Sequence, residues 1–165
     1  MAGRKGQSTV EFILAFGAIL LPMTFMLIFV SQLLWVWHSV NEFTREGASY
    51  ASSHCWESSG QNVVDFMRAN VPPMVMGDQV QSGPAQISVA YFSQDDTGQL
   101  APYSGGGDCS TSCVPDVVTV SISGFQFGSF LTSVGLPPIT VPNLQASLPM
   151  ESAGFNADTP GACVP

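Results

Sequence analysis

The stretch QSTVEFILAFGAILLPMTFMLIFV, residues 7–30, decides what kind of protein this chain is. No charged residue occurs between Phe12 and Val30, a run of 19 residues. An α-helix of that length spans about 28 Å, close to the thickness of bilayer hydrocarbon. A helix that is apolar on every side needs either lipid or a large surrounding core, and this chain is too short for the latter. The stretch therefore predicts a membrane anchor.

The residues after this run argue against a cleaved signal peptide. Such a peptide has a shorter apolar core followed by a small-x-small cleavage site. Here the chain continues into SQLLWVWH, residues 31–38, which contains no such site. Trp35, Trp37 and His38 fall where an aromatic belt would meet the outer membrane interface. A retained anchor is thus favoured over a signal peptide and over a buried helix.

The charges predict the orientation of the anchor. The chain has 4 Lys and Arg against 12 Asp and Glu, for a net charge of −8. Arg4 and Lys5 precede the apolar run and no cation follows it closely, so the N-terminus is expected in the cytoplasm and the rest is expected to be exported. The lack of clustered cations argues against nucleic acid as a partner.

Two helices are expected before any strand. Apolar residues at steps of three and four extend the first helix to about Ser53, namely Leu33, Leu34, Trp37, Val40, Phe43 and Gly47. Pro22 and the nearby Gly17 predict a bend or a tilt within the membrane part. A second helix is expected over residues 59–71, capped by Ser58 or Ser59 and stopped by Pro72 and Pro73.

The remaining residues predict a small sheet. Residues 86–92, 117–123 and 139–150 each alternate apolar with polar or small side chains, as antiparallel strands with one wet face do. Residues 95–115 are expected to be a loop and residues 152–165 an extended tail. The segment 125–131 is apolar but contains helix breakers, so it fills the core, lies on the membrane or touches a neighbouring subunit. The expected fold class is α+β, with about three strands on the outer half of the long helix.

The cysteines are expected to form disulfides. An exported chain with an even number of cysteines favours disulfides over a metal site, for which two histidines are too few. Three pairings are possible, and we favour Cys109 with Cys113 and Cys55 with Cys163.

Nothing in the sequence predicts catalysis or a cofactor. There is no phosphate-binding glycine loop after a strand, no nucleophile elbow and no Ser/His/Asp constellation. The acids around the glycine-rich loop match no EF-hand, so we interpret them as solvated turn residues rather than as a metal site; they are Asp95, Asp96, Asp108 and Asp116. The chain is interpreted as non-enzymatic.

Glu11 is the unusual residue of the anchor. A carboxylate at the head of an apolar span stays at the interface, where the helix dipole favours it, or finds a cationic partner. If the chain were cut after Gly6, Gln7 would become the first residue. In an assembly of parallel helices, its ammonium would then neutralise Glu11 of a neighbouring subunit.

Gly6, a short polar step, Glu11 and an apolar helix together resemble the class III signal of type IV pilins and pseudopilins. Prepilin peptidase cuts such signals after the glycine, on the cytoplasmic side. The wording STVEF at residues 8–12, with Pro22 in mid-span, resembles the TadE family of tight-adherence (Flp) pilus proteins. The motif Arg-Glu-Gly-Ala at residues 45–48 strengthens this resemblance, which covers residues 6–53.

The resemblance implies a structural pilin or pseudopilin of a Tad/Flp-type pilus. We expect a leader (1–6), a long N-terminal helix (7–57) and an exported α+β domain (58–165). Implied partners are other pilin subunits, prepilin peptidase, the inner-membrane assembly platform and the membrane itself. The protein would reside in the bacterial inner membrane and then on the cell surface.

In this hypothesis Gly6 and Gln7 form the processing site and Glu11 guides filament assembly. Arg45, Glu46 and Gly47 are expected at a subunit or helix contact. The alternative hypothesis is an uncleaved, permanently anchored scaffold or binding protein of a pilus or secretion apparatus.

Overall fold

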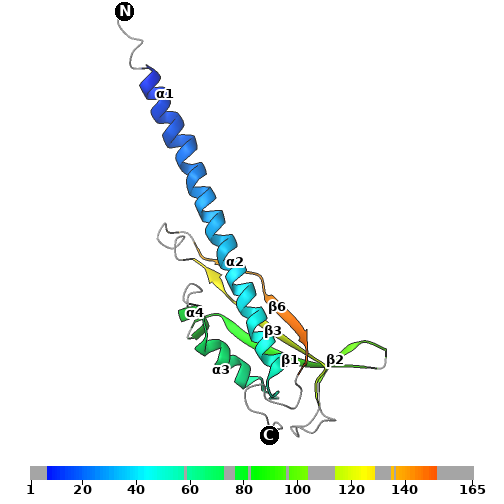
Figure 1. The fold of residues 1–165 in the computed structure, drawn as a ribbon. Helices are drawn as coiled ribbons and strands as arrows, with labels where there is room; N and C mark the ends of the chain where they lie inside the picture. Colours follow the sequence, from blue (N-terminus) through cyan, green and yellow to red (C-terminus); the bar gives the residue numbers. More distant parts are fainter. Residues whose placement is uncertain are drawn as a thin grey trace, which may run out of the picture. The chain divides into compact units, whose positions relative to one another are not determined.

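The structure of the chain, a computed structural model, describes residues 7–57, 59–72, 77–81, 83–95, 97–103, 114–128, 135 and 137–151. Contacts between residues divide the chain into two compact units, Met1–Val36 and Trp37–Pro165. The elements are helices at the start and a sheet afterwards (Figure 1). The structure therefore has the expected α+β class.

The first unit is helical throughout its described residues. It contains α1 (Gln7–Ala15), the π-helix η1 (Phe16–Leu20) and the beginning of α2 (Leu21–Ser53). The end of α2 at Ser53 agrees with the end predicted from the apolar spacing.

The π-helix lies directly before Pro22, where the sequence predicts a bend. The backbone N–H of Leu21 donates to the carbonyl oxygen of Phe16, five residues back. Pro22 has no N–H, and its ring would crowd the carbonyl of Ala18 in a regular α-helix. A single wide turn removes that crowding while the chain stays helical.

The second unit begins with the last turns of α2, which have one buried face. The buried residues recur at steps of three and one along this segment and are Val40, Phe43, Thr44, Gly47, Ala48, Ala51 and Ser52. Two shorter helices follow, α3 (Gln61–Ala69) and α4 (Gly77–Gln81). The predicted apolar stripe is thus buried from Val40 onward, whereas Leu34 and Trp37 are exposed.

Both ends of α3 differ from the prediction. Its N-cap is Gly60, at φ +61°, and a Cβ there would also run into Val89 of the sheet. Ser58 lies outside the described residues, and the Ser59 hydroxyl accepts a hydrogen bond from the Gln61 backbone at 3.3 Å without being the cap residue. The helix ends at Ala69, before the two prolines, and the C-cap Asn70 donates its backbone N–H to the carbonyl oxygens of Phe66 and Met67 and its side-chain amide to Phe66 at 2.9 Å.

The main sheet has four antiparallel strands in the order β2-β1-β3-β6. They are β1 (Gln86–Gln94), β2 (Leu100–Pro102), β3 (Val117–Ser123) and β6 (Leu144–Pro149). A second sheet pairs β4 (Gln126–Phe127) with β5 (Ile139–Thr140). In Figure 1, α2 and α3 cover one face of the main sheet.

Two expectations for the sheet need correction, and a third is confirmed in part. The segment expected as one strand over 139–150 is two strands, β5 and β6, separated by residues 141–143, which include Pro142. The expected loop over 95–115 contains β2, which pairs with the end of β1. In the segment 125–131, Phe125 and Phe127 are buried, so core filling is correct for its described part.

The two faces of the main sheet have different chemistry. Alternate residues of β3 are fully or almost fully buried toward the helices, namely Val118, Val120 and Ile122. On the opposite face, hydroxyl groups bond across the strands: Ser88 with Ser121 at 2.7 Å, and Thr119 with Ser147 at 2.8 Å. The predicted half-alternation is confirmed by this arrangement.

Gly47 allows α2 and α3 to approach closely. A Cβ added to Gly47 would clash with Sδ of Met67 and lie 2.9 Å from its Cε atom. Met67 is fully buried in α3. Any side chain at position 47 therefore competes with the thioether of Met67 for the same space.

We expect Gly47→Ala to lower the free energy of unfolding of the protein. In a Met67→Ala background the same substitution is expected to raise it. Alanine gains about 1 kcal/mol of helix propensity over glycine, but overpacking costs about 1–3 kcal/mol. Without the thioether the clash is gone, so the same substitution becomes stabilising by about 1 kcal/mol. Urea unfolding of the four proteins in detergent, a double-mutant cycle, measures this. The same sign in both backgrounds would contradict the packing argument.

Three aromatic rings are in contact just after the end of α2. Trp56 packs edge-on against Tyr91 and Tyr103, with ring centroids 5.9 and 5.2 Å apart. Among the residues that the structure describes, the buried atoms Nε1 of Trp56 and Oη of Tyr91 have no hydrogen bond of good geometry. Burial raises the pKa of Tyr91 to about 12; the nearby Glu57 backbone opposes this rise and the Glu57 charge adds to it.

This raised pKa predicts a loss of stability at high pH. The folded protein keeps the Tyr91 proton more tightly than the unfolded chain, whose tyrosine titrates near 10. The stabilisation of the folded state by protonated Tyr91 is therefore complete below pH 10. It is lost as the pH rises toward 12, and about 1 kcal/mol of it is lost at pH 11. Urea unfolding between pH 8 and 11 should show this decline, and Tyr91→Phe should remove it. Tyr103→Phe is the matched control and should keep it; an unchanged slope in Tyr91→Phe would refute the assignment.

Candidate assembly helix and the exposed face of α2

The N-terminal helix exposes its apolar side chains over the whole membrane-length stretch. The continuous helical segment Ser8–Ser53 contains an 18-residue window with a mean hydropathy of 2.6, and none of that window is buried. Phe12 and Met26, for example, are each 68% exposed. By length and composition this helix is a candidate membrane span, which agrees with the predicted anchor.

Polar side chains within this span bond to the helix itself. The hydroxyl of Thr24 donates to the Leu21 carbonyl at 2.8 Å, and that of Ser31 donates to the Leu27 carbonyl at 2.8 Å. Such bonds satisfy hydroxyl groups that would otherwise be costly in hydrocarbon. The span therefore presents an apolar outer surface even at its polar positions.

Glu11 is the single charged residue from position 7 to position 41. It lies in α1, four residues after Gln7, the first residue of that helix, and it is exposed. Gly6 lies outside the described residues. Gln7 of the predicted processing site is thus the first residue of the helix, and the Glu11 carboxylate lies one turn further along.

The motif at residues 45–48 divides between the two faces of α2. Gly47 and Ala48 are buried, whereas Arg45 and Glu46 are exposed. Arg45 Nη1 lies 3.9 Å from Glu42 Oε2, and both side chains are about two-thirds exposed. An exposed pair of this kind contributes little to stability, so the two charged residues are available for other contacts.

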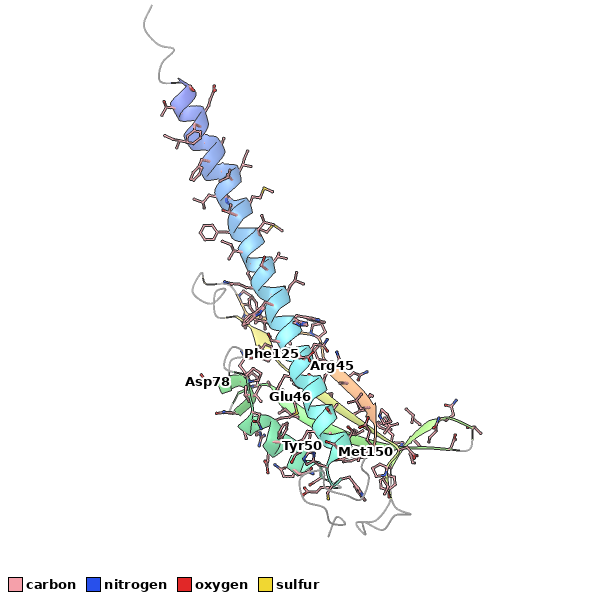
Figure 2. All side chains as sticks on the ribbon, viewed as in Figure 1. Arg45, Glu46, Tyr50, Asp78, Phe125 and Met150 are labelled. Atoms are coloured by element: carbon pink, nitrogen blue, oxygen red, sulfur yellow. The ribbon has the colours of Figure 1, made fainter. Side chains whose placement is uncertain are left out.

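A groove of about 560 Å³ lies along this exposed face, which sequence analysis did not find. It is lined by Glu42, Arg45, Glu46, Ser49, Tyr50, Ser53, Phe66 and Leu148. Arg45, Glu46 and Tyr50 follow one another along α2 (Figure 2). The Tyr50 ring stacks on Phe66 of α3 and on His54, with centroids 3.8 Å apart in both pairs. Only the pairing of α2 with α3 and β6 creates this groove.

Cys55 lies two residues after the end of α2 and is disulfide-bonded. The other predicted disulfide residues, Cys109, Cys113 and Cys163, lie outside the described residues. The pairing of Cys55 with Cys163 therefore stays a prediction.

Within the described residues, no group of three or more His, Cys, Asp or Glu side chains is placed to hold a metal ion. Asp95 instead closes a turn, because its carboxylate accepts hydrogen bonds from Thr97 and Gln99. The Thr97 hydroxyl, followed by the backbone N–H groups, lowers the pKa of Asp95. Asp116 accepts from the Gln94 backbone at 2.7 Å, while Asp96 and Asp108 lie outside the described residues.

Comparison with known proteins gives one result for the N-terminal segment. Residues 6–49 match the family model described as TadE-like protein. No curated protein and no solved structure matches the chain. The matched segment begins at Gly6, includes Glu11 and the whole apolar run, and ends just after the motif at residues 45–48. The resemblance to TadE-like, Tad-pilus-associated proteins is confirmed over residues 6–49 of this chain.

Proposed function

We propose that this protein is a structural pilin or pseudopilin subunit of a Tad/Flp-type pilus. The observation that carries the proposal is the long apolar helix that the described residues leave uncovered, within a segment that matches TadE-like proteins. Lipid covers such a surface before assembly, and neighbouring helices cover it afterwards. The proposed role is structural and requires no catalytic group or cofactor.

Processing by prepilin peptidase is part of the proposal. Cleavage after Gly6 would leave Gln7 as the first residue, at the start of α1. Its new ammonium group would lie one helical turn before Glu11 in its own chain and beside Glu11 of a staggered neighbour. A charge pair that is removed from water is stabilising only when both partners are present, so this pair would select parallel subunits at a defined stagger.

The exported unit would make the remaining contacts. Its exposed motif residues Arg45 and Glu46 are proposed at a subunit contact, while the buried Gly47 serves the α2–α3 contact. We propose that Cys55 pairs with Cys163, which would join the tail to the end of α2. Other pilin subunits and the assembly platform of the inner membrane are the proposed partners, with the N-terminus cytoplasmic.

The first test is the N-terminus of the protein isolated from its native cells. We expect the intact mass and N-terminal sequencing to give a chain that begins at Gln7. Each disulfide should lower the mass by two hydrogens, and peptide mapping should find Cys55 with Cys163. A chain that still begins at Met1 or Ala2 would favour the uncleaved scaffold instead.

The second test removes the charge of Glu11. We expect Glu11→Gln to reduce incorporation into filaments by at least tenfold, because an unpaired buried ammonium costs about 3–5 kcal/mol. Membrane insertion should be unaffected, since the substitution makes the span more apolar. Asp65→Asn, at an exposed acid of α3 outside the proposed subunit contact, is the matched control. Sheared filaments and membrane fractions, probed by immunoblotting, give the two quantities. Normal incorporation of Glu11→Gln would exclude the proposed role of the carboxylate.

A further inference from the structure

The groove beside Tyr50 offers both charged and apolar groups to a partner. Its lining includes three charged residues, two stacked aromatic rings and a leucine, namely Glu42, Arg45, Glu46, Tyr50, Phe66 and Leu148. An arginine side chain has the matching chemistry, because its methylene stem packs on apolar surface while its guanidinium binds a carboxylate. The groove therefore suits an arginine from outside the chain.

Glu46 is the acid of the groove that has no ion pair within the described residues. The other acid, Glu42, lies 3.9 Å from Arg45. Glu42 and Glu46 are one helical turn apart on the exposed face of α2, and like charges at this spacing repel each other. A second cation in the groove would relieve that repulsion and pair with Glu46.

The chain itself contains a suitable cation. Arg4 and Lys5 precede the apolar run, so Arg45 and Arg68 are the two cations that follow it, together with every acid except one. Arg68 is exposed in the last turn of α3 and forms no ion pair within the described residues. We propose that Arg68 of a neighbouring copy of this chain enters the groove and pairs with Glu46. The inference rests on the proposed function.

Arg68 and the groove lie on different faces of α3. Phe66 lines the groove, and Arg68 follows two residues later, about 200° further around the helix. A copy can therefore give Arg68 to one neighbour while its own groove receives the arginine of another. Such a contact is heterologous and propagates along a filament. It also brings an acid and a cation together wherever two acidic copies, which otherwise repel, come into contact.

The first test separates this pairing from general repulsion. Glu46→Gln and Arg68→Gln should each reduce incorporation into filaments by roughly tenfold or more, because each leaves one charge of the pair without its partner. General repulsion between acidic copies predicts the opposite result for Glu46→Gln, since this substitution makes the chain less acidic. Normal incorporation of either glutamine variant would overturn the inference.

Asp65→Asn is the matched control for Glu46→Gln, because it makes the same change in charge. The Asp65 carboxylate accepts a hydrogen bond from Gln61 of its own helix at 2.7 Å, and it has no place in the proposed pair. Its incorporation should stay within about twofold of the wild-type level. A loss equal to that of Glu46→Gln would show that acids of this unit act together and would contradict the specific pairing.

Co-expression of two charge-reversed variants tests whether the pair joins different copies. Glu46→Arg copies and Arg68→Glu copies, carrying different tags, should each fail to assemble alone. Expressed together they should form filaments that contain both tags, because each contact between them again joins an acid to an arginine. Neither a folding defect nor a pair within one chain would be rescued in this way.

The outcomes of this experiment distinguish the inference from the proposed function. If wild-type filaments form but the mixture of variants stays unassembled, the inference alone is overturned. If the wild-type protein forms no filaments, the proposed function fails and the inference fails with it.

Discussion

The apolar surface of one continuous helical segment is the constraint on which the rest of this structure depends. From Val40 to Ser52 the buried face of α2 is covered within the second unit, where Met67 of α3 lies against Gly47. From Phe12 to Ile28 the described residues cover none of the large apolar side chains. Exposed apolar area costs about 25 cal/mol per Å², so this second region requires lipid or other helices.

The covered half depends on close packing at small residues. Gly47 and Ala48 let α3 approach α2, and Met67 occupies the space that a side chain at position 47 would need. On the opposite side of α2, Arg45 and Glu46 remain exposed beside the stacked rings of Tyr50 and Phe66. In the motif at residues 45–48, Gly47 and Ala48 therefore pack inside the second unit, whereas Arg45 and Glu46 belong to its outer surface.

The uncovered half contains its own irregularity. Pro22 removes a backbone donor, and the chain responds with a π-turn rather than a break.

The sequence by itself determined the membrane-length helix, its end at Ser53, the α+β class and the span of β3, because each follows from local periodicity. It also determined the TadE-like character of residues 6–49. Only the tertiary structure decided the short β2, the division of residues 139–150 into two strands and the groove beside Tyr50. Strand pairing and grooves belong to two segments that meet in space, and the periodicity of either segment alone does not contain them.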